Sequence, residues 1–87
     1  MLRELLEIGK VETRILILLS ERPRTVRSLM RDLGTRNNRP LKRLIKRGLV
    51  EVYQGRLLSP YKLLVLTKRG REVADFLIKL GLAIGPI

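Results

Sequence analysis

The chain has 87 residues, 45% of them hydrophobic, and its 19 lysines and arginines against 8 aspartates and glutamates give a formal net charge of +11. This length suits one domain near the lower limit for an independent core, so we expect residues 1–87 to form a single domain with its core within about residues 10–80. The chain has no cysteine and no histidine, which excludes disulfides, removes the usual zinc ligands and general base, and leads us to expect no metal, no cofactor and no enzymatic activity.

The first half of the chain is predicted to be helical. Apolar residues at helical spacing occupy residues 2–6 and, after Gly9, residues 10–20, and Pro23 ends the second stretch. Thr25 is a suitable N-cap for a short helix that buries one face. The apolar positions of that helix are Val26, Leu29, Met30 and Leu33.

Basic residues are concentrated in one segment of the chain. From residue 22 to residue 47 there are ten basic residues and one acid, Asp32, whereas the other nine basic residues are spread among seven acids. A cluster of this kind favours a face that binds a polyanion over an evenly solvated basic surface.

A helix is predicted within this basic segment, over about residues 37–47. Proline is tolerated only in the first turn of a helix, so Pro40 indicates a helix capped by Asn37 or Asn38. At roughly 100° per residue, aliphatic side chains and cations fall on opposite sides, so that one face should offer only cations to solvent. The aliphatic side holds Leu41, Leu44 and Ile45, and the cationic side holds Arg39, Arg43, Lys46 and Arg47, with Lys42 at its margin.

Beyond the basic helix, the pattern is that of a β-hairpin followed by a final helix. Residues 49–53 and 61–66 are predicted to be strands because they are rich in β-branched and aliphatic residues. Thr67 is then the expected cap of a helix that Gly81 ends.

Two motifs in the second half resemble those of winged helix-turn-helix transcription regulators of bacteria and archaea. Leu44 with residues 48–50 (GLV) resembles the end of the recognition helix in those families, and residues 61–70 (YKLLVLTKRG) resemble the entry to the helix after the wing. The resemblance covers about residues 10–80. It implies a mainly α fold with a small β-hairpin, built as a three-helix core, a two-stranded wing and a C-terminal helix.

The same resemblance implies that the helix at about 37–47 enters the DNA major groove and that the wing, at about 54–60, contacts the flanking backbone. The segment between Gly34 and Gly48 is about one helical turn shorter than in the commonest family members, so the family's base-reading positions are not transferred residue by residue. Residue types still indicate roles, since arginine and asparagine suit base edges and lysine and arginine suit phosphates.

The candidate DNA contacts fall into three groups. Those expected to read bases, unless an asparagine only caps the helix, are Arg36, Asn37, Asn38 and Arg39. Those expected to bind phosphate, unless they form a merely solvated face, are Lys42, Arg43, Lys46 and Arg47. Those on flanking elements are Arg27 and Ser28 of the preceding helix, to which Arg24 and Arg31 are also assigned, and Arg56 and Lys62 of the wing.

Apolar residues near both ends exceed what one small core needs, so we expect a homodimer in which segments 1–9 and 81–87 contribute to the interface. The expected interface residues are Leu2, Leu5, Leu6, Phe76, Leu80, Leu82 and Ile84. Two leucines of the wing loop, Leu57 and Leu58, are expected to pack back onto the domain.

The sequence favours a sequence-specific, double-stranded-DNA-binding transcription regulator. An RNA-binding or architectural winged helix is an alternative, although Tyr53, Tyr61 and Phe76 are all expected to be structural, which leaves no exposed stacking aromatic. A winged-helix module for protein–protein assembly is a second alternative. The first residues do not resemble a signal peptide, and the longest aliphatic run, residues 15–19, is too short to span a bilayer. We therefore expect no membrane partner and a cytoplasmic, nucleoid-associated location.

Overall fold

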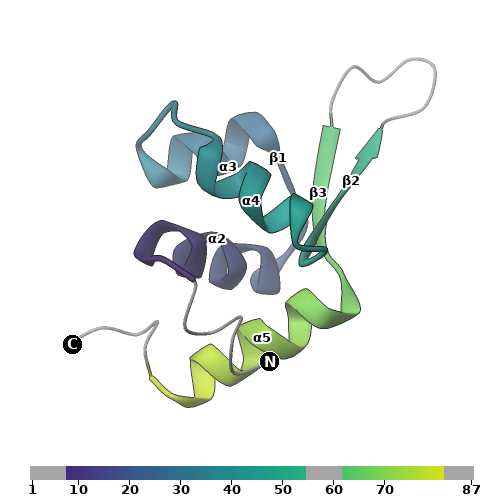
Figure 1. Cartoon of the computed structure of the whole chain (residues 1–87). Coiled ribbons are helices and arrows are strands. Elements are labelled where there is room, and N and C mark those ends of the chain that lie inside the picture. The colour runs from purple at the N-terminus through teal and green to yellow at the C-terminus, as the bar shows by residue number, and fades with distance from the viewer. Residues whose placement is uncertain (1–7, 55–61, 82–87) are drawn as a thin grey trace.

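The computed structural model describes residues 8–54 and 62–81 of the chain. Four helices and three strands follow one another within these residues. They are α2 (Lys10–Glu21), β1 (Arg24–Thr25), α3 (Val26–Leu33), α4 (Arg39–Lys46), β2 (Val50–Gln54), β3 (Lys62–Leu66) and α5 (Lys68–Lys79). Helix α2 lies between the α3–α4 pair and α5, and β2 and β3 project to one side of the helices (Figure 1).

The strands form an antiparallel sheet in which β3 lies between β1 and β2. Leu64 at the middle of β3 pairs with Val52 on β2 and with Arg24 on β1. The two predicted strands are confirmed and pair with each other as expected of a hairpin, and β1 adds a third strand that the sequence did not indicate. A strand of two residues is too short to show the alternation by which strands are recognised in a sequence.

Local chemistry sets the ends of the helix-turn-helix formed by α3 and α4. The Ser28 N–H donates a hydrogen bond of 3.1 Å to Thr25 Oγ1, which caps α3 as predicted. Gly34 ends α3 in the left-handed region, with φ 69°, where a side chain would be strained. Helix α4 is slightly shorter than the predicted range of about 37–47, and Pro40 lies in its first turn as expected.

The core is made of aliphatic side chains from all four helices and from the two longer strands. It confirms the apolar face predicted for α4, since Leu41 and Leu44 are buried and Ile45 packs against them. The buried hydrophobic residues are Ile15, Leu16, Leu19, Leu29, Leu41, Leu44, Leu49, Val50, Leu64, Val73, Ala74 and Leu77.

Helix α5 begins and ends where the sequence predicted. Thr67 is its N-cap, and the Gly70 N–H donates a hydrogen bond of 3.0 Å to Thr67 Oγ1. Gly81 follows the helix with φ 75°. The final helix therefore runs from the end of the sheet back along α2 (Figure 1).

Some predicted features lie outside the described residues. These are the helical pattern at residues 2–6, the wing loop, and the individual residues Leu2, Leu5, Leu6, Arg56, Leu57, Leu58, Tyr61, Leu82 and Ile84.

Candidate nucleic-acid interface

The outward face of α4 is cationic. The helix turns Pro40, Leu41 and Leu44 into the core, which leaves Arg39, Lys42 and Lys46 exposed on the opposite side. Acidic residues are absent from α4, so nothing within the helix offsets these charges. Such a face can neutralise phosphates along a nucleic-acid groove.

The turn before α4 gives its two asparagines different roles. The Asn37 N–H donates a hydrogen bond of 3.0 Å to Thr35 Oγ1, and Asn37 Oδ1 accepts one of 3.1 Å from the Arg39 N–H. Asn38 occupies the N-cap position but makes no side-chain capping bond. Asn37 therefore builds the turn, as an asparagine does in an Asx turn, whereas Asn38 and Arg36 lie exposed beside it.

Two arginines of the predicted phosphate-binding face are engaged with an acid on α2. Arg43 Nε lies 3.1 Å from Glu12 Oε1, and Arg47 Nη1 lies 3.9 Å from Glu12 Oε2. The expectation that this face offers only cations to solvent is therefore wrong for Arg43 and Arg47. The sequence could not show this ion pair because Glu12 and Arg43 are 31 residues apart.

Cations from three elements meet in a groove of about 430 Å³ between α3, α4 and the sheet. Arg27 is on α3, Lys42 is on α4 and Lys62 is on β3, and each was predicted as a DNA contact. The groove also has an apolar lining that includes Val52 and Leu64. Ser28 was predicted with Arg27, but its backbone is committed to the α3 cap, and its side chain is half-buried.

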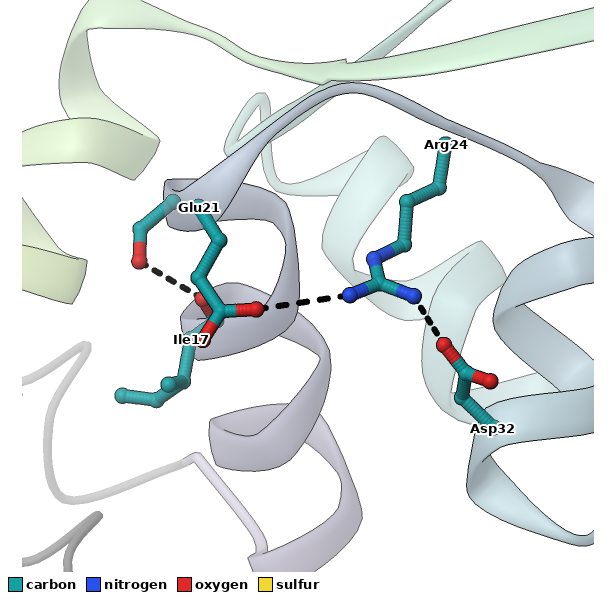
Figure 2. A network of polar contacts seen from close by, with 5 residues as sticks. Ile17, Glu21, Arg24 and Asp32 are labelled. Atoms are coloured by element: carbon teal, nitrogen blue, oxygen red, sulfur yellow. Dashed lines mark hydrogen bonds and ion pairs between the residues drawn. The ribbon is translucent and has the colours of Figure 1, made fainter.

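Arg24 does not belong to the DNA-facing surface of α3, contrary to its assignment from the sequence. It lies on β1, and its side chain is 7% exposed. Its guanidinium forms ion pairs with Asp32 and with Glu21, the latter at 3.3 Å, as Figure 2 shows. Arg24 thus links the end of α2 to α3, and it pairs with Asp32, the one acidic residue between residues 22 and 47. Arg31, in contrast, is exposed on α3.

Two of the three aromatic residues are exposed, which corrects the expectation that all are structural. Tyr53 on β2 is 55% exposed and Phe76 on α5 is 41% exposed. A hydrogen bond to the neighbouring Glu51 carboxylate, together with its negative charge, raises the pKa of the Tyr53 hydroxyl above its ordinary value. An exposed aromatic side chain on β2 is therefore available to stack on a base.

The predicted dimer interface is represented among the described residues by Phe76 and Leu80. Both had been placed on the same α5 face as Val73 and Leu77, but only the latter two are buried. Leu80 is 55% exposed, and Phe76 is also exposed. The described part of α5 therefore has apolar side chains that its own core does not cover.

Within residues 8–54 and 62–81, no group of three or more His, Cys, Asp or Glu side chains is arranged to hold a metal ion. Among the helices of the same residues, none has the length and apolar character needed to cross a membrane.

The fold is that of solved winged-helix proteins. The adhesin competence repressor AdcR of Streptococcus pyogenes covers 91% of this chain with a TM-score of 0.77 and 18% identity. A double mutant of ZitR of Lactococcus lactis, in apo form, covers 92% with a TM-score of 0.78 and 19% identity. FabT of Streptococcus pneumoniae, solved in complex with DNA, covers 90% with a TM-score of 0.78 and 19% identity.

These similarities define the class of fold, and the winged helix-turn-helix predicted from the sequence is confirmed. AdcR is a repressor by name and FabT is bound to DNA, so the structures that the chain resembles include transcription regulators rather than enzymes. The chain spans 61%, 63% and 57% of the lengths of the AdcR, ZitR and FabT chains. No protein-family model matches the sequence, and no curated protein matches it.

Proposed function

We propose that this chain is a sequence-specific, double-stranded-DNA-binding transcription regulator in which α4 is the recognition helix. One observation carries the proposal: the exposed side of α4 bears only polar and cationic residues, in a fold that FabT uses in its complex with DNA. A recognition helix lies in the major groove and presents its N-terminal residues to base edges. The fold and this charge pattern together favour a regulator over an enzyme.

The interface divides into base-reading and phosphate-binding parts. Arg36, Asn38 and Arg39 lie exposed at the N-terminal end of α4, where side chains of these types can bind guanine or adenine. Lys42 and Lys46 lie farther along the exposed face and suit phosphates. Arg27 and Lys62 flank them from α3 and β3, and we propose that they contact the adjoining backbone.

The proposed functional unit is a homodimer in the cytoplasm, associated with the nucleoid. Exposed Phe76 and Leu80 support an apolar contact between α5 helices. Two copies would place two α4 helices about one duplex turn apart, roughly 10 bp, on a near-palindromic site.

A second candidate function is binding of RNA or single-stranded DNA, and the exposed Tyr53 is the observation that favours it. Stacking of a base on an aromatic ring contributes roughly 1–3 kcal/mol and is tolerant of sequence. The two functions differ in the substrate preferred, so one experiment separates them.

The experiment is selection of bound molecules from random pools of duplex DNA, single-stranded DNA and RNA at one stated salt concentration. We expect enrichment of duplexes with two related half-sites. The Lys46→Glu variant should lose the enrichment, whereas Arg71→Glu, with the same charge change on the side of α5 away from Phe76 and Leu80, should keep it. Recovery of RNA or single strands without any duplex enrichment would favour the second candidate and contradict the first.

A further inference from the structure

Glu12 is an acid in direct contact with the proposed recognition helix, and nothing in the proposed contact with DNA uses it. It is on α2, and its side chain is only 5% exposed. A buried carboxylate is strongly disfavoured unless a cation accompanies it. Here the cations are Arg43 on α4 and Arg47, which follows the end of that helix.

The geometry fixes the direction of Arg43. The atom that donates to Glu12 is Nε, at the base of the guanidinium, so the Nε–H edge of the planar group faces the carboxylate on α2. The side chain is nevertheless 53% exposed, and that of Arg47 is 30% exposed. Both arginines therefore lie at the edge between the core and the cationic face, where a protein carboxylate and a DNA phosphate would compete for them.

The charges of Glu12, Arg43 and Arg47 show how much positive charge remains available to bind DNA phosphates. Glu12 offsets one unit of the positive charge that Arg43 and Arg47 carry together. Its second oxygen, Oε2, is buried and accepts no hydrogen bond within the described part of the chain. The unmet acceptor favours holding both arginines close, because a buried carboxylate oxygen gains from each nearby donor.

We propose that Glu12 is a positioning residue of the DNA interface: it holds Arg43 and Arg47 against α2, and thereby limits phosphate binding to Lys42, Lys46 and residues flanking α4. This inference rests on the proposed function as a duplex-binding regulator. Fewer phosphate contacts mean weaker sequence-independent binding and a shallower dependence of affinity on salt. Glu12 would therefore set the electrostatic part of the affinity without touching DNA.

The test is the dependence of duplex affinity on salt, which reports the number of phosphates neutralised. In Glu12→Gln the amide oxygen can still accept the Arg43 hydrogen bond, but the negative charge is gone. We expect tighter binding to random-sequence duplex and a log–log salt slope steeper by about 0.9 for each arginine released. Glu21→Gln, which removes the same charge from an acid paired with Arg24, should leave the slope unchanged.

A second comparison holds even if Glu12→Gln does not fold, as judged by circular dichroism. In the otherwise unchanged chain, Arg43→Gln should alter the salt slope far less than Lys46→Gln, which should flatten it by about 0.9. Where Glu12→Gln does fold, adding Arg43→Gln to it should return the slope toward that of the parent chain, which is the coupling a double-mutant cycle detects.

The outcomes separate the inference from the function on which it rests. Equal flattening by Arg43→Gln and Lys46→Gln, or a slope that Glu12→Gln leaves unchanged while the protein is folded, would overturn the role of Glu12. Failure of the unaltered chain to bind any duplex would instead contradict the proposed function itself.

Discussion

Gly70 lies so close to Leu49 that a β-carbon at position 70 would stand 1.9 Å from the Leu49 carbonyl oxygen. The same oxygen accepts a hydrogen bond of 3.1 Å from the Thr67 N–H, and Thr67 Oγ1 donates one of 2.7 Å to the Gly48 carbonyl. The first turn of α5 is thus locked onto the turn that follows α4. This contact sets where the proposed recognition helix lies relative to the last helix.

Replacing Gly70 with alanine is expected to destabilise the fold by about 1–3 kcal/mol, because the added methyl meets backbone that cannot move aside. The helix propensity of alanine, better than that of glycine by about 1 kcal/mol, opposes this cost without removing it. Chemical denaturation measures the change. Lys68→Ala, in the same turn at an exposed position, is the control and should change stability by less than about 0.5 kcal/mol.

The contact between the turn after α4 and the first turn of α5 explains why two weak sequence motifs, taken together through the family resemblance, predicted the fold. Residues 48–50 and 61–70 were singled out separately in the sequence, and the structure brings Gly48 and Leu49 against Thr67 and Gly70. Each motif has a local structural cause that its residue type indicates in the sequence. Gly48 adopts a φ of 77°, and Thr67 caps α5. Their mutual contact could be expected only from the family resemblance.

Two kinds of feature could not be predicted from the sequence: ion pairs between residues far apart in the chain, and strands of only two residues. The periodicity of α4 placed Arg43 on the cationic side correctly, but it could not show that α2 supplies Glu12 to that edge of the helix. Arg24 appeared to be one more surface cation because nothing local marks a two-residue strand or a part-buried ion pair with Asp32. The exposure of Tyr53 was missed because a strand pattern does not reveal which face remains uncovered.

The two asparagines before α4 should respond differently to substitution. Asn38→Ala is expected to lose about 1–3 kcal/mol of discrimination at one base pair, because its side chain is exposed and caps nothing. Asn37→Ala is expected to retain the base preference and to lower stability by about 0.5–1.5 kcal/mol through loss of its bond to the Arg39 N–H. Binding to single-base variants of the selected site, together with denaturation, measures both. An unchanged base preference in Asn38→Ala would remove it from the base-reading group.

Tyr53 should titrate above the ordinary pKa of tyrosine, because the Glu51 carboxylate accepts its hydrogen bond and repels the phenolate. The absorbance of the phenolate measures this in a Tyr61→Phe background, since the chain has two tyrosines. Glu51→Gln should return the pKa toward its ordinary value. A pKa raised in the folded state adds stability that is present below about pH 10 and is lost as the pH rises through the folded value. A Tyr53 midpoint that Glu51→Gln does not lower would disprove the interaction.

Assembly is predicted to depend on one side of α5. Phe76 and Leu80 are exposed on that side, whereas Ile78, also exposed, is about 200° around the helix from Phe76. If the α5 helices pair across a two-fold axis, Phe76→Glu and Leu80→Glu should each convert the dimer to a monomer, because a charge would be buried in an apolar contact. Ile78→Glu adds the same charge on the opposite side and should leave the dimer intact.

Light scattering at micromolar concentration gives the mass directly, without DNA present. A particle of twice the chain mass that only the Phe76 and Leu80 variants reduce supports the contact. DNA binding provides an independent test, because a monomer contacts only one half-site. Both variants should lose the preference for paired half-sites about 10 bp apart. They should keep the base preference within each half-site. A chain that is monomeric before any substitution, or a dimer that all three variants leave unchanged, would contradict pairing through this side of α5.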